Sequence, residues 1–266
     1  MQILLNVSVF LLFNHKTAGT DENPPFPVRI EAMGINDKRV LLFDIDGTLL
    51  DPADEGVVCL RRALEDVYGV TGPIEAYDMA GKTDWQIVTD LMTLAGLDPD
   101  AIESRRLDAF TAYARHVEIA AASFRMRLLP GIQTLLDRLA AEDEFILGLV
   151  TGNVREAVPH KLRAVGIDPG LFRFGAFGSE HIDRNTLPAL ALYRLGQMLG
   201  EAVPPERALV IGDTPRDVAC GRHEGLKVLC VATGRYDRQA LAEVRPDFLL
   251  DDLSDTHSVL EILQKF

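Results

Sequence analysis

The sequence predicts an α/β fold, in which helices cover both faces of a doubly wound parallel sheet. Three observations lead to this prediction. Short apolar runs without polar alternation recur along the chain, as strands buried on both faces require. Segments with apolar residues at helical spacing lie between these runs. After the first run, a long segment carries helical patterns alone, which indicates an inserted all-helical unit.

The first 37 residues are interpreted as an N-terminal extension of irregular chain. Residues 1–13 are mostly apolar, but this run is too short to span a bilayer. Residues 14–37 contain three prolines and two glycines, which are typical of irregular structure. A compact domain could begin directly at Met33. We therefore interpret residues 1–32 as dispensable, with a targeting segment as the alternative.

The predicted sheet has five strands and a sixth, weaker candidate. The five occupy residues 40–43, 145–150, 208–211, 228–232 and 248–250, and the weaker candidate occupies residues 174–177. Helices are predicted over residues 132–140, 154–165, 187–199 and 217–224. This alternation of strand and helix is typical of a Rossmann-like core. The core is accordingly assigned to residues 38–53 and 124–266.

Residues 54–123 are predicted to form a helical cap inserted into this core. Apolar side chains recur at helical spacing from Val57 to Tyr68, and again from Ile87 and from Ala109 onward. No strand pattern appears in this segment. Its acidic side chains outnumber its basic ones, so its surface is suited to a small ligand and not to a large polyanion.

The composition is that of an ordinary globular protein with an acidic balance. The 266 residues include 40 Asp and Glu against 27 Lys and Arg, a formal net charge of −13. This balance argues against a nucleic-acid partner, because phosphate backbones bind clustered Lys and Arg. The three cysteines form no CxxC pair, so neither a disulfide scaffold nor a zinc site is predicted. We expect a cytoplasmic monomer or homodimer that does not bind membranes.

The candidate functional residues follow the predicted strands directly. Ligands of doubly wound sheets bind outside the carboxyl ends of the strands. The first strand leads into Asp44 and Asp46, and a later strand leads into Asp213 and Asp217. Carboxylates that converge at one edge repel one another unless a cation lies among them, and all-oxygen donors suit Mg²⁺. The sequence therefore predicts a Mg²⁺ site, in which Asp217 either binds the ion or orients the other groups.

These residue types indicate phosphoryl transfer. A carboxylate fixed beside Mg²⁺ can attack phosphorus in line, so Asp44 is the predicted nucleophile. Asp46 is the predicted general acid and base, and Thr151, after the second strand, is predicted to donate to phosphoryl oxygens. The residues expected to contact substrate are Gly47, Thr48, Gly152, Asn153 and, in the cap, Lys82.

Three sequence boxes together carry a family resemblance. They are DxDGT at residues 44–48, Thr151 after an apolar strand, and GDxxxD at residues 212–217. In order and spacing they resemble the haloacid dehalogenase superfamily, in particular its phosphoglycolate phosphatase-like branch with a helical cap. The resemblance covers roughly residues 38–255. It implies that Asp44 and Asp213 bind Mg²⁺ through their carboxylates, and Asp46 through its main-chain carbonyl.

One position departs from the family pattern. The family usually has a Lys between the second and third boxes, where this chain reads HIDRNTLP at residues 181–188. Arg184 is the predicted substitute. Its guanidinium can neutralise the nucleophile and hold phosphate, although a planar fork is not a point charge.

The expected function is Mg²⁺-dependent hydrolysis of small phosphorylated metabolites through an aspartyl-phosphate on Asp44. Phosphoglycolate-like substrates are what the resemblance implies. Two alternatives remain at this point. A phosphosugar mutase would use the same intermediate and return the phosphoryl group to a sugar. A non-catalytic binding or regulatory protein could also be built on this fold.

Overall fold

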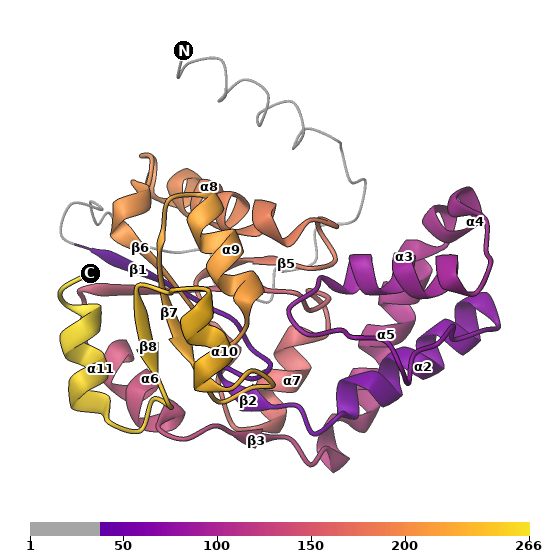
Figure 1. Cartoon of the computed structure of the whole chain (residues 1–266), viewed down its shortest axis with the longest axis horizontal. Coiled ribbons are helices and arrows are strands. Elements are labelled where there is room, and N and C mark those ends of the chain that lie inside the picture. Colours follow the sequence, from indigo (N-terminus) through magenta and orange to yellow (C-terminus); the bar gives the residue numbers. More distant parts are fainter. Residues whose placement is uncertain (1–37) are drawn as a thin grey trace.

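The computed structural model describes residues 38–266, so the predicted extension of residues 1–37 lies outside the described part. A six-stranded sheet has the strand order β5-β4-β1-β6-β7-β8, and all its neighbouring pairs are parallel (Figure 1). The strands are β1 (Arg39–Phe43), β4 (Phe145–Thr151), β5 (Phe174–Phe177), β6 (Ala208–Gly212), β7 (Lys227–Val231) and β8 (Phe248–Leu250). The predicted α/β class is confirmed, and the weaker candidate over residues 174–177 is a strand.

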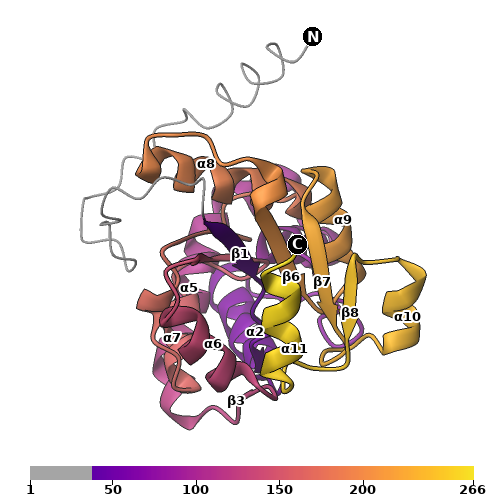
Figure 2. The same cartoon turned by 90° about the vertical axis from the view of Figure 1, so that its left-hand side faces the viewer.

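Alternation within each strand divides the core between the two faces of the sheet. In β1, Leu41 and Phe43 pack into one apolar cluster, whereas Val40 and Leu42 pack into another. The first cluster is covered by α6 (Ile132–Ala140), α7 (Val158–Ala164) and α11 (Thr256–Leu263). The second is covered by α8 (Leu187–Leu199), α9 (Pro215–His223) and α10 (Arg238–Glu243). Figure 2 shows α8 across the sheet from α6 and α7.

The chain order places the site within this sheet. From β1 the chain continues to β4 and β5 on one side, and from β6 it continues to β7 and β8 on the other. The strand order therefore reverses between β1 and β6. A crevice opens at the carboxyl ends of strands at such a point, and this is where doubly wound sheets bind ligands.

Four helices from the inserted segment lie beside the carboxyl ends of the strands (Figure 1). They are α2 (Glu55–Tyr68), α3 (Asp84–Leu94), α4 (Pro99–Ser104) and α5 (Arg106–Ala120). They share an apolar cluster, which also includes Val154 and Ala157 of the core and in which the aromatic rings of Phe110 and Tyr113 are buried. A two-stranded antiparallel sheet of β2 (Leu50–Asp51) and β3 (Arg127–Leu128) joins the two connections to the core. The boundaries of the cap as a domain stay a prediction.

Two helix starts differ from those predicted. The helix predicted from residue 154 begins at Val158, because Pro159 favours the first turn of a helix and the preceding residues form turns. The helix predicted from residue 217 begins at Pro215, where Thr214 and Asp217 form a capping box. Within residues 38–266, no helix is long and apolar enough to cross a membrane.

Candidate active site

Strands β1 and β6 bring the first and third boxes together. Phe43 is in register with Ile211, and the backbone N–H of Asp44 donates to the Ile211 carbonyl over 2.9 Å. Asp44 and Asp213 therefore leave neighbouring strands at the same edge. With Asp217 on α9, they form a buried group whose carboxylate oxygens lie within 4.8 Å of one another. The predicted convergence of these three carboxylates is what the structure shows.

Arg184 lies among these carboxylates. It begins a short 3-10 helix, Arg184–Thr186, directly before α8. Its Nη2 lies 2.9 Å from Asp44 Oδ2 and 2.5 Å from Asp217 Oδ1. The guanidinium is 6% exposed, so both ion pairs are shielded from water. Arg184 thus lies where its guanidinium can neutralise Asp44. That it takes the place of the family's usual lysine stays a prediction.

Backbone atoms enclose the carboxylate of Asp213. A Cβ atom at Gly47 would lie 2.3 Å from Asp213 Oδ2, and one at Gly234 would lie 1.7 Å from it. Only glycine permits this approach at both positions, and Gly47 also has a φ of 84°. Thr48 Oγ1 donates to Asp213 Oδ1 over 3.1 Å. The DGT turn therefore holds Asp213 in place, and a substrate contact by Gly47 or Thr48 stays a prediction.

Both oxygens of the Asp217 carboxylate accept hydrogen bonds from the protein. Oδ1 accepts from Arg184, and Oδ2 accepts from both the backbone N–H and the hydroxyl of Thr214, over 2.9 and 2.7 Å. These contacts orient Arg184, whereas the predicted role of Asp217 in orienting the metal site stays a prediction. Direct binding of a metal ion by Asp217 stays a prediction.

The electrostatics of the group indicate excess negative charge. Burial raises the pKa of Asp44 to about 6, although the Arg184 guanidinium opposes the rise. Burial also raises the pKa of Asp213 well above its ordinary value, and the charges of Asp217 and Asp44 add to this effect. One guanidinium is therefore too little positive charge for three buried carboxylates.

A second polar group surrounds Asp46. Asn153 Nδ2 donates to Asp46 Oδ2 over 3.0 Å and to Thr151 Oγ1 over 2.8 Å. Lys161 Nζ donates to the same Asp46 oxygen over 2.5 Å, and to Asn153 Oδ1 over 2.6 Å. The structure thus brings Asp46, Thr151 and Asn153 together as predicted, and it adds a lysine that sequence reasoning missed. The available signal was helical spacing, since Lys161 follows the buried Ala157 by one turn.

Two buried polar atoms at this site have no partner. They are Asp46 Oδ1, an acceptor, and Arg184 Nε, a donor, and no other buried side-chain nitrogen or oxygen of residues 38–266 is unpaired. Buried polar atoms without a hydrogen bond are rare because desolvation is costly. The unpaired donor beside the nucleophile is one that a phosphoryl oxygen could satisfy, and the unpaired Asp46 oxygen could donate to an ester oxygen when it carries a proton.

The cap contributes a loop that packs onto the core beside Gly152. The backbone N–H of Asp84 donates to the Gly152 carbonyl over 2.7 Å, and its carboxylate accepts from the Val154 N–H over 2.7 Å. A Cβ at Gly152 would lie 2.0 Å from the Lys82 carbonyl oxygen. This loop therefore covers the turn that follows β4 and shields it from water.

The side chain of Lys82 is held within the cap. Its ammonium donates to the Tyr77 hydroxyl over 2.5 Å, lies 3.9 Å from the centre of the Tyr77 ring and is 3.6 Å from Asp90. The backbone of Lys82, and not its charge, is what contacts the core in this structure. The predicted contact between Lys82 and substrate stays a prediction.

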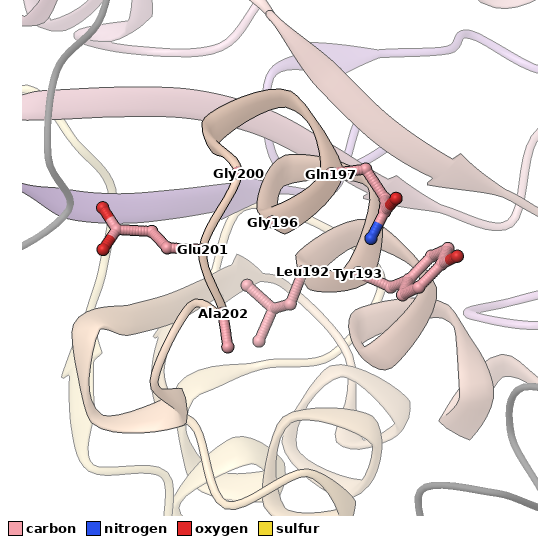
Figure 3. A pocket seen from close by; sticks show the side chains of 7 residues that line it. All are labelled: Leu192, Tyr193, Gly196, Gln197, Gly200, Glu201 and Ala202. Carbon is pink, nitrogen blue, oxygen red and sulfur yellow. The ribbon is translucent and has the colours of Figure 1, made fainter.

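A separate pocket lies at the far end of α8 (Figure 3). Its lining residues are Leu192, Tyr193, Gly196, Gln197, Gly200, Glu201 and Ala202. Because α8 runs from the site back towards the start of β6, this pocket lies at the opposite edge of the sheet from Asp44. It contains none of the predicted site residues.

The fold and the site together define an α/β enzyme with a carboxylate cluster at its strand ends. Residues 41–231 match the family model of the haloacid dehalogenase-like hydrolases, and the chain belongs to this family. It is 30% identical to a phosphoglycolate phosphatase of Synechococcus elongatus over 82% of this chain and 94% of that protein. It is 27% identical to the pyrophosphatase PpaX of Anoxybacillus flavithermus, over 88% of this chain and 100% of that protein.

A solved structure supports the fold. The crystal structure of a predicted phosphoglycolate phosphatase from Haemophilus somnus superposes with a TM-score of 0.61 at 24% sequence identity. The match covers 85% of this chain and 100% of that one. The prediction that the chain is a haloacid dehalogenase-like hydrolase is confirmed, and its relatives support a hydrolase of phosphate esters.

Proposed function

We propose that this chain hydrolyses small phosphate monoesters through an aspartyl-phosphate on Asp44, with Mg²⁺ as cofactor. The observation that carries the proposal is the pair of unpaired buried atoms, Asp46 Oδ1 and Arg184 Nε, with the Arg184 guanidinium 2.9 Å from the Asp44 carboxylate. The similarity to a phosphoglycolate phosphatase supports phosphoglycolate-like substrates as the first to test. Free cysteines within the described residues support a cytoplasmic location.

The donor set fits Mg²⁺. Asp44 and Asp213 offer carboxylate oxygens, which hard cations prefer. The pKa of Asp213 is raised first by burial and then by the charges of Asp217 and Asp44, and a cation would offset these charges. These two carboxylates would hold the ion, together with the main-chain carbonyl of Asp46 that the family resemblance implies. When bound, Mg²⁺ would offset the negative charge of the phosphoryl oxygens and of the carboxylates beside them.

The side chains then have distinct chemical roles. An Asp44 oxygen attacks phosphorus in line, and the bond from phosphorus to the leaving oxygen breaks as the new bond forms. Asp46 gives its proton to the leaving oxygen. It next takes a proton from water, whose oxygen attacks phosphorus and releases phosphate and free Asp44. Arg184 and Thr151 stabilise the phosphoryl oxygens as donors.

The test is hydrolysis of p-nitrophenyl phosphate with Mg²⁺ or with EDTA. Asp44→Asn is expected to lower kcat by about 10³-fold or more, because it removes the nucleophile. Asp251→Asn is the matched control, since Asp251 is 80% exposed and pairs only with a surface arginine. Equal rates for the wild-type and Asp44→Asn proteins would contradict the mechanism.

A panel of phosphate esters then separates the remaining candidates. Release of inorganic phosphate from phosphoglycolate and other monoesters supports a phosphatase. Conversion of one sugar phosphate to its isomer, without release of phosphate, would identify a mutase instead.

A further inference from the structure

Lys161 is a buried cation outside the three sequence boxes. It lies on α7, its side chain is 2% exposed, and its ammonium contacts Asp46 and Asn153. Removing an ammonium from water costs several kcal/mol, so lysines are almost never fully buried without a partner. Its distance in sequence from Asp46, 115 residues, shows that the fold and not local chain geometry creates this pair.

The contacts of Lys161 make the two oxygens of Asp46 different. Oδ2 accepts from Lys161 over 2.5 Å and from Asn153 over 3.0 Å. Oδ1 is buried and accepts from no group within residues 38–266. The carboxyl group is therefore held by one oxygen, and the other oxygen is left unpaired, so it is the one that can carry a proton.

Lys161 also fixes the side chain of Asn153. The ammonium donates to the amide oxygen, so the amide nitrogen must point towards its acceptors, Asp46 Oδ2 and Thr151 Oγ1. Without this contact the amide could rotate and offer its oxygen to Asp46 instead. Lys161 thus acts on Asp46 both directly and through Asn153.

Arg184 does not duplicate this role. Its ion pairs are with Asp44 and Asp217, and no ion pair joins it to Asp46. The described part of the site therefore has one cation for the nucleophile and another for the acid/base.

We propose that Lys161 is a positioning residue for general acid and base catalysis by Asp46, which rests on the function proposed above. In the first half-reaction the bond between phosphorus and the leaving oxygen breaks, and that oxygen takes its electron pair and the proton from Asp46 Oδ1. In the second, Asp46 Oδ1 takes a proton from the attacking water while the bond between phosphorus and Asp44 breaks. Lys161 keeps Oδ2 in place throughout.

Leaving-group dependence tests this proposal. A good leaving group such as p-nitrophenolate needs no proton to depart, whereas an alkoxide does, and positioned acids contribute about 10²–10⁴-fold. The constant kcat/KM reports the steps up to leaving-group departure. Lys161→Met is expected to lower kcat/KM by about 10²-fold for an alkyl phosphate such as phosphoglycolate, and by less than about 5-fold for p-nitrophenyl phosphate.

Three further variants make the result specific. Lys161→Arg retains the charge and is expected to recover part of the loss with the alkyl ester. In an Asp46→Asn background, Lys161→Met is expected to have little further effect, because the group that it positions is already absent. Lys265→Met is the matched control, since Lys265 is 71% exposed and pairs with Glu261 on the surface.

Two results would overturn the proposal. Equal losses with both esters would show that Lys161 supports the structure in general, and an unchanged rate with the alkyl ester would show that Asp46 is positioned without it. The urea midpoint of each variant shows whether it is folded. Failure of the proposed function has a different signature, because hydrolysis would then be insensitive to Asp44→Asn.

Discussion

Replacing Arg184 by methionine is expected to destabilise the protein by about 3–5 kcal/mol in EDTA, because it leaves buried carboxylates without their cation. The two ion pairs, at 2.9 and 2.5 Å, each correspond to about 6 kcal/mol of attraction at an effective dielectric constant near 20. The expected loss of stability is smaller than the sum of these two attraction energies. A buried methionine avoids the desolvation cost of the guanidinium, and Asp44, whose pKa is already about 6, can take up a proton.

The assay is urea unfolding followed by far-ultraviolet circular dichroism at pH 8 in EDTA. Arg238→Met is the matched control, because Arg238 pairs with Asp251 at 3.0 Å with both side chains at least half exposed. Exposed pairs contribute about 0–1 kcal/mol, so the control should stay close to the wild-type protein. Arg184→Lys is expected to lose less than the methionine variant, because it keeps the charge.

Mg²⁺ should partly rescue the methionine variant, since a divalent ion would then supply the positive charge that Arg184 no longer places beside Asp44. At a concentration 100 times its Kd, a ligand that binds only the folded state adds about 2.7 kcal/mol. If Arg184→Met unfolds within about 1 kcal/mol of the wild-type protein in EDTA, the assignment of Arg184 as the neutralising cation is wrong.

Two further predictions concern the contact between cap and core. Burial raises the pKa of Asp84 to about 7, so the folded state binds this proton more tightly than the unfolded state does. Ionised Asp84 therefore lowers the free energy of unfolding, and this destabilisation is fully present above pH 7. Asp84→Asn should therefore raise the melting temperature more at pH 8.5 than at pH 5, and an equal difference at both would contradict this. A Cβ at Gly152 would overlap the Lys82 carbonyl, so Gly152→Ala should lower kcat/KM by about 10-fold or more, through the loss of cap contact. The stabilisation by Mg²⁺ should be unchanged, and Gly56→Ala is the control, because its Cβ would approach only the Tyr113 hydroxyl, at 3.3 Å.

The strand-end residues could be predicted because they depend on a simple geometric rule. Parallel strands end at a common edge, so an apolar run followed by Asp44 and another followed by Asp213 must bring their carboxylates close if the strands are neighbours. The register of β1 and β6 shows that they are neighbours. Arg184 was predictable from the position that the family pattern leaves without a lysine.

Other features depend on contacts between distant residues, which a single sequence does not show. The helix predicted from residue 154 begins later, and the carboxylate of Asp84 in the cap accepts from the Val154 N–H at that point. Strands β2 and β3 have two residues each, too few for any periodic pattern. Lys161 has the side chain of a surface residue, and only its helical spacing could have indicated that it is buried.

Counting charges connects the two cations to the proposed metal. The site contains four carboxylates, those of Asp44, Asp46, Asp213 and Asp217. When all four are ionised, Arg184 and Lys161 supply two positive charges against them, so an excess of two negative charges remains, which one divalent cation would balance. A phosphate dianion that entered without this cation would double the excess in a buried, low-dielectric site. On the proposed function, therefore, neither Arg184 nor Lys161 replaces Mg²⁺. Lys161 pairs with Asp46, and Arg184 pairs with Asp44 and Asp217, so the negative charge that is left for Mg²⁺ lies at Asp44 and Asp213.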